Sequence, residues 1–95
     1  MDDEKYSQLR TILRHNVMYL SELLPGARAT VISVSDLSNP DPIAMRLRDL
    51  GFVAGEPVSL VAHGPFGVEP LLVQIGFTRF ALRRSEAARV EVENV

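Results

Sequence analysis

The side chains with the clearest capacity for chemistry in this sequence are two histidines and a glutamate. His63 stands at one edge of the turn HGPFGVEP, and closure of a hairpin there brings Glu69 toward its ring. Imidazole nitrogens and carboxylate oxygens both bind divalent transition metals. His15 is a third candidate ligand, and a dimer would complete either site by donating ligands across its axis. Two ligands from one hairpin are too few for a tight site, so a solvated turn histidine is the simpler interpretation.

None of the common catalytic arrangements is present in the sequence. It contains no cysteine, which excludes disulfides, thiolate metal sites and cysteine nucleophiles together. The two histidines have no triad motif around them. A phosphate-binding loop needs several backbone amides and a lysine, whereas GFVAG and GPFG lack this pattern and the only lysine is Lys5. We therefore expect a protein that is not an enzyme and requires no cofactor, with a weakly bound divalent transition metal as the alternative.

Arginines and phenylalanines alternate near the end of the sequence. They are Phe77, Arg79, Phe80, Arg83, Arg84 and Arg89. Small barrels use such mixtures to bind RNA or single-stranded DNA. Strand alternation places Phe77 and Arg79 on one face and Phe80 on the other, so at least one phenylalanine belongs to the core. The net charge is -2, with one excess acid in each half, and we expect no nucleic acid partner.

Apolar spacing in the first third of the chain predicts a helix and then a strand. Residues 4–15 have apolar side chains at three- and four-residue intervals after two capping aspartates, which is typical of an amphipathic helix. Residues 17–20 either continue that helix or form a short strand, and both interpretations bury Leu20 and Leu23. The segment 27–34 alternates with β-branched residues and is predicted to be a strand.

The remaining elements are short. Asp41 is predicted to cap a helix over 42–50, and Gly51 suits a left-handed cap at its end. Further strands are predicted at 57–62, 71–75, 77–82 and 90–95, with one helical turn that Ser85 caps. Five or six short strands are too few for a large sandwich, so a small, partly open barrel best protects their edges. The expected fold class is therefore mainly β.

The composition is that of one folded domain. The 95 residues are 46% hydrophobic and 23% charged, and a second core would leave too little apolar surface for either. The start, MDDEKYSQLR, is acidic where a secretory signal is basic, and no apolar run approaches the roughly 18 residues of a membrane span. We expect a cytoplasmic protein that does not insert into the membrane.

Two blocks of the sequence form a specific combination. The block MRLRDLGFVAGEPVSLV contains the pattern Arg-Leu-x-x-Leu-Gly-hydrophobic-x-x-Gly, carried by Arg46, Leu47, Leu50, Gly51, Phe52 and Gly55. The second block is ALRRSEA, over 81–87. Together with LSELLPGARATVISV, they make the chain similar from about Met18 to Val92 to the FeoA family, small cytosolic proteins encoded beside the ferrous iron permease FeoB.

The resemblance implies an SH3-like β-barrel over residues 18–95 and no catalytic residues. Residues 1–17 form a helical extension outside the usual domain, which packs on its own barrel or mediates a homodimer. The resemblance also implies a role in ferrous iron uptake through contact with the FeoB-type permease or its cytosolic GTPase domain. A related barrel occurs in iron-dependent repressors, so a metal-responsive module is the family-level alternative.

The stretch RLRDLGFVAG, residues 46–55, contains most of the residues that we expect to contact a partner protein. In the implied barrel the helix 42–50 closes one end, and Gly51 lets the chain reverse. Phe52 and Val53 are neighbours that cannot both point inward, so we expect Phe52 to be buried and Val53 exposed. An exposed apolar residue beside arginines is a suitable anchor for a partner protein. The candidate partner contacts are Arg46, Arg48, Val53 and Phe66.

Overall fold

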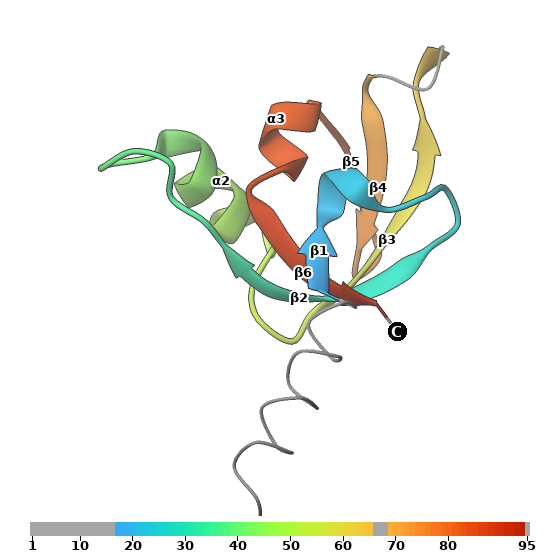
Figure 1. Ribbon diagram of the computed structural model, residues 1–95, viewed down its shortest axis with the longest axis horizontal. Helices are drawn as coiled ribbons and strands as arrows, with labels where there is room; N and C mark the ends of the chain where they lie inside the picture. The colour runs from blue at the N-terminus through green and yellow to red at the C-terminus, as the bar shows by residue number, and fades with distance from the viewer. Residues whose placement is uncertain (1–16, 66–68, 95) are drawn as a thin grey trace, which may run out of the picture.

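The computed structural model describes residues 17–65 and 69–94 (Figure 1). The helix predicted over 4–15 lies outside these ranges. In chain order, the described elements are β1 (Val17–Tyr19), η1 (Leu20–Glu22), β2 (Arg28–Val34), α2 (Pro42–Leu50), β3 (Pro57–His63), β4 (Leu71–Ile75), β5 (Thr78–Leu82), α3 (Arg84–Ala87) and β6 (Val90–Asn94). None of the described helices is long and apolar enough to cross a membrane.

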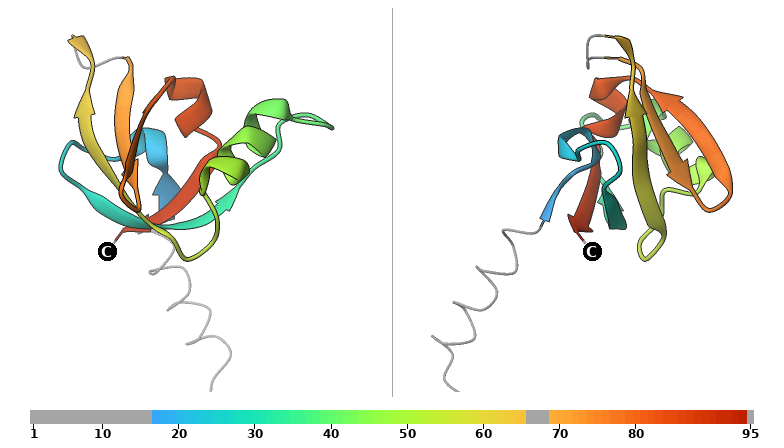
Figure 2. Two further views of the ribbon diagram at one scale, coloured as in Figure 1. Left: turned by 180° about the vertical axis from the view of Figure 1, so that it is seen from behind. Right: turned by 90° about the vertical axis from the view of Figure 1, so that its right-hand side faces the viewer.

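The six strands form one antiparallel sheet in the order β1-β6-β2-β3-β4-β5. The sheet curls around a common interior, with α2 on one side of the molecule and the β3–β4 hairpin on the other (Figures 1 and 2). The register shifts between Val31 and Ser33 in β2 and between Leu60 and Ala62 in β3. Such bulges increase the local twist, which helps a short sheet to curl. The predicted mainly β, partly open barrel is confirmed.

The core is built from the alternating strand residues and from Phe52. Leu20 and Leu23 are buried as expected, and the strand option for the residues before them is the correct one. The Phe52 side chain is fully buried, and its ring is tilted against that of Phe80 with the centroids 6.1 Å apart. Val53, the next residue, remains 45% exposed. The expectation for this pair of neighbours is confirmed.

The two ends of α2 are formed as the sequence predicts. The Asp41 carboxylate accepts hydrogen bonds from the backbone N–H groups of Ile43 and Ala44, which have no partner within the helix. At the other end Gly51 has a φ of 114°, in the left-handed region that glycine adopts without strain. Leu47 is buried beneath the helix, so α2 is packed against the core between two well-formed caps.

The start of α3 differs from the prediction that Ser85 is its cap. The helix already begins at Arg84, so Ser85 lies inside it. The free N–H groups of the first turn are satisfied by carboxylates: Arg83 N–H donates to Glu86 Oε1 at 2.7 Å. Arg84 N–H donates to Glu69 Oε1 at 2.8 Å, and Glu69 lies 15 residues earlier in the chain. An acceptor from a distant turn thus replaces the local serine.

Candidate functional site

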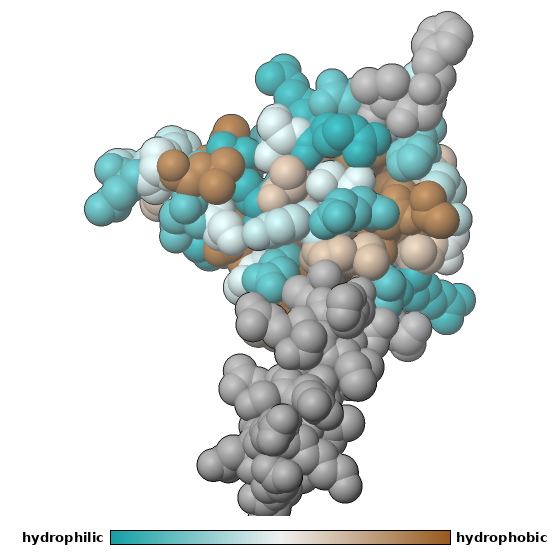
Figure 3. Space-filling model, in the orientation of Figure 1, coloured by the Kyte–Doolittle hydropathy of each residue, from teal (hydrophilic) through white to brown (hydrophobic). Residues whose placement is uncertain are grey.

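Exposed hydrophobic side chains gather on and beside α2. Met45 is 53% exposed, Leu37 in the preceding loop 67%, and Val53 follows the helix. Arg46 lies next to Met45, with 65% of its side chain exposed. We call Leu37, Met45, Arg46 and Val53 the α2 surface. Figure 3 shows hydrophobic residues over the α2 end of this face, surrounded by polar ones. Apolar side chains beside a cation can anchor a partner protein.

Arg46 and Arg48 are not equivalent in the structure, although both were predicted as partner contacts. Arg46 lies 3.7 Å from Glu86, in a long ion pair whose arginine side chain is largely exposed, so the contact contributes little. Arg48 donates to both carboxylate oxygens of Asp36, at 3.0 and 2.9 Å, and to the carbonyl of Val34 at 2.7 Å. The Asp36 carboxylate raises the pKa of Arg48. Arg48 therefore ties α2 to the end of β2.

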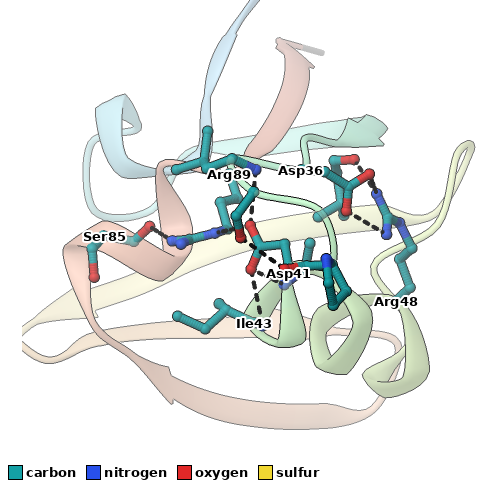
Figure 4. A network of polar contacts seen from close by, with 11 residues as sticks. Asp36, Asp41, Ile43, Arg48, Ser85 and Arg89 are labelled. Carbon is teal, nitrogen blue, oxygen red and sulfur yellow. Dashed lines mark hydrogen bonds and ion pairs between the residues drawn. The ribbon is translucent and has the colours of Figure 1, made fainter.

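A buried ion pair holds the other end of α2. The Asp41 carboxylate, 2% exposed, receives the Arg89 Nε–H at 2.9 Å and the Leu37 N–H at 2.9 Å, besides its two capping bonds (Figure 4). Arg89 also donates to the Ser85 carbonyl at 2.6 Å. The Leu37 N–H, the Arg89 guanidinium and the Ala44 N–H hold the pKa of Asp41 well below its usual range, although burial opposes them. Asp41 thus joins the loop, α2 and the α3–β6 connection.

Two of the three predicted metal ligands, His63 and Glu69, lie at the opposite end of the molecule, in the β3–β4 hairpin. His63 is the last residue of β3, and its Nε2 atom is buried and has no hydrogen-bond partner among the described residues. Glu69 is on the other side of the hairpin, and one oxygen of its carboxylate accepts the hydrogen bond from Arg84 N–H at the start of α3. No group of three His, Cys, Asp or Glu residues suited to a metal is found in ranges 17–65 and 69–94. His15 and Phe66 are outside the described residues, so the full ligand set and partner set remain predictions.

The arginines and phenylalanines near the end of the chain are spread over several environments. Arg89 is in the buried ion pair, and Arg84 donates to the carbonyl of Ser21. Phe80 packs against the core, in agreement with strand alternation. Phe77 was predicted to be within a strand, but it lies in the β4–β5 turn and is fully exposed. The strand begins one residue later because Gly76, with φ of 59°, and Phe77 form the turn.

The sequence was compared with protein families and solved structures. The FeoA domain family matches residues 18–94, which is most of the chain. This chain belongs to the FeoA family. FeoA proteins are associated with ferrous iron transport, and the curled six-stranded sheet described above is their SH3-like fold.

Solved FeoA structures support this assignment. Stenotrophomonas maltophilia FeoA, a prokaryotic SH3 domain protein crystallised with zinc, is 64% identical, with a TM-score of 0.76 over 80% of this chain and 89% of that one. Chlorobium tepidum FeoA is 35% identical, with a TM-score of 0.70 over 82% and 70%. A manganese-dependent transcriptional repressor, 18% identical with a TM-score of 0.70, shares the fold over 83% of this chain and 42% of its own. No curated protein sequence matches this FeoA chain.

Proposed function

We propose that this chain is a non-enzymatic accessory protein that binds the cytosolic GTPase part of a FeoB-type permease and modulates ferrous iron transport. The family match over residues 18–94 is the observation that carries the proposal. The Stenotrophomonas maltophilia relative is described as a candidate activating factor of ferrous iron transport, and its 64% identity supports the same role here. The protein then acts by occupying a surface of the permease.

The α2 surface is the part of the chain that suits this contact. Leu37, Met45 and Val53 present apolar area to solvent, and Arg46 supplies a largely exposed cation whose contact with Glu86 is long, at 3.7 Å. The surface is also preorganised, because contacts of Asp41 and Arg48 hold the two ends of the helix. A rigid surface loses less conformational entropy on binding, which favours affinity.

Charge insertion into the α2 surface is expected to weaken binding to the permease. Val53→Asp places a carboxylate where an apolar side chain would be buried, and at least about a tenfold loss in affinity is expected. Calorimetry with the purified GTPase domain, with and without a GTP analogue and ferrous iron, measures it. Leu24→Asp is the matched control, because Leu24 is 74% exposed in the loop before β2, outside the α2 surface. Equal losses for both variants, or no binding in any condition, contradict the proposal.

A second candidate function, weak binding of a divalent transition metal, is favoured by the buried Nε2 atom of His63, which accepts or donates no hydrogen bond within the described part of the chain. In this proposal His63 and Glu69 are the first ligands and His15 adds a third. Calorimetric titration with zinc or with ferrous iron under anaerobic conditions is expected to show micromolar affinity that His63→Ala abolishes. His15→Ala then shows whether the third ligand takes part. If the unsubstituted chain binds neither ion in the micromolar range, this function is excluded.

A further inference from the structure

The short helix α3 lies between the β3–β4 hairpin and α2, and it makes polar contacts toward both (Figure 1). Toward the hairpin, the Arg84 N–H donates to Glu69 Oε1 at 2.8 Å. Toward α2, the Ser85 carbonyl accepts from Arg89 Nη1 at 2.6 Å, and Arg89 Nε–H donates to the Asp41 carboxylate that caps α2 (Figure 4). A series of hydrogen bonds through α3 therefore joins the hairpin to the start of α2.

The Glu69 carboxylate has one oxygen left for a ligand. Its Oε1 atom is used by α3, whereas Oε2 has no hydrogen bond or ion pair with any residue in ranges 17–65 and 69–94. A carboxylate offers about four lone-pair sites, so a second partner does not displace the first. Glu69 is therefore able to bind a metal ion through Oε2 while Oε1 still accepts from the Arg84 N–H.

Gly64 fixes where Glu69 lies relative to β3. A Cβ atom at Gly64 would overlap with the carbonyl oxygen of Glu69, so only glycine allows the two sides of the hairpin to approach so closely. The residue before Gly64 is His63, whose Nε2 atom is buried and unpartnered in the described part of the chain. The two predicted ligands and the start of α3 thus meet at one end of the hairpin.

We propose that a divalent metal ion held by His63 and Glu69 stabilises α3 and, through α3, the α2 surface. This inference rests on the metal-binding function proposed above. The Glu69 side chain is exposed, so without the ion it exchanges among several rotamers, of which one reaches the Arg84 N–H. The ion binds best to chains in which Glu69 already has that rotamer, and a ligand shifts a protein toward the state that binds it better.

The effect reaches α2 because one arginine contacts both helices. The side chain of Arg89 is only 12% exposed, and it bonds the Ser85 carbonyl and the Asp41 carboxylate together. A better-ordered α3 therefore holds the guanidinium against the α2 cap, and a better-ordered α2 surface loses less entropy when it binds a partner. By linkage, a partner on the α2 surface tightens the metal site by the same factor.

Amide hydrogen exchange in the full-length protein, followed by NMR, tests this coupling. Saturating zinc is expected to slow exchange of the Arg84 and Ala44 amides, which donate to Glu69 and Asp41, by about fivefold. The Val31 amide, which donates to the Glu56 carbonyl outside this series, reports general stabilisation and should slow less.

Three variants locate the link. In Glu69→Gln an oxygen still accepts from the Arg84 N–H but the charged ligand is lost, so the slowing by zinc should disappear while exchange without zinc changes little. Gly64→Ala shifts the Glu69 backbone and leaves both ligands in place, so exchange of the Arg84 amide should be faster without zinc; circular dichroism checks that this variant folds. Glu93→Ala, which removes an exposed carboxylate on β6, is the matched control and should change neither.

Calorimetry with zinc on the same samples separates the outcomes. If zinc binds with micromolar affinity but the Arg84 and Ala44 amides are unchanged, or slow no more than Val31, the coupling is wrong while the metal site stands. Slowing that persists in Glu69→Gln also overturns the proposal, because Glu69 is then not the link. If zinc does not bind at all, the metal-binding function fails and the coupling fails with it.

Discussion

Replacement of Phe52 by alanine is expected to lower the free energy of unfolding by about 3–5 kcal/mol, the usual range for deleting a fully buried aromatic side chain. The Phe52 side chain has no exposed area and contacts the Phe80 ring, so the variant leaves a cavity between β5 and the end of α2. Gly51 and the α2 cap restrict the backbone there, which limits collapse of the cavity. Urea denaturation followed by circular dichroism measures the change.

Val53→Ala is the matched control for Phe52. Its side chain is the next in the chain but is 45% exposed, so the free energy of unfolding should change by no more than about 0.5 kcal/mol. Comparing the two variants shows which of the two neighbouring residues in the block MRLRDLGFVAGEPVSLV belongs to the core and which is free to contact a partner. If both variants lose similar stability, Val53 is packed in solution and is unsuitable as a partner contact.

Arg89→Ala is expected to cost about 3 kcal/mol, because it removes one partner of a buried ion pair and leaves the Asp41 carboxylate without its cation. Three backbone N–H donors still solvate that carboxylate, which places the cost at the lower end of the range for such pairs. Thermal and urea unfolding measure it. Arg46→Ala, which removes only the long 3.7 Å contact of a largely exposed arginine with Glu86, should stay within about 0.5 kcal/mol of the unsubstituted protein.

The pH dependence of unfolding provides a check on the same pair. The pKa of Asp41 is lower in the folded chain than in the unfolded chain, so its carboxylate contributes stability that is present above about pH 4 and is lost as the pH falls further. In Asp41→Asn the midpoint of thermal unfolding should be lower at neutral pH and should fall less below pH 4. A variant that keeps the acid dependence of the unsubstituted protein would show that other carboxylates cause it.

These contacts also bear on the proposed function. The Asp41–Arg89 pair joins the start of α2 to the segment before β6, and Arg48 joins its last turn to β2 (Figure 4). Loss of either should loosen the α2 surface and reduce affinity for the permease without removing any contact residue. Stability variants and surface variants can therefore be distinguished by measuring unfolding and binding together.

Much of the fold was predictable because its signals are local. The alternation of β2, the Asp41 cap and the left-handed Gly51 each depend on residues only a few positions apart. That only one of the neighbours Phe52 and Val53 is buried followed from the geometry of an extended chain, and the structure shows that it is Phe52. The FeoA pattern is also read directly from the sequence, and the SH3-like barrel was expected because of it.

The sequence alone thus determined the element types, most of the core and the family. Tertiary structure alone decided which charges meet: Asp41 and Arg89 are 48 residues apart, and Glu69 replaces Ser85 at α3 because the hairpin returns it there. The alignment of Arg28, Ser59, Gln74 and Arg79 across β2 to β5 likewise exists only through the register of four strands. The physical reason is that caps and periodicity depend on neighbouring residues, whereas ion pairs and grooves depend on which strands become adjacent after folding.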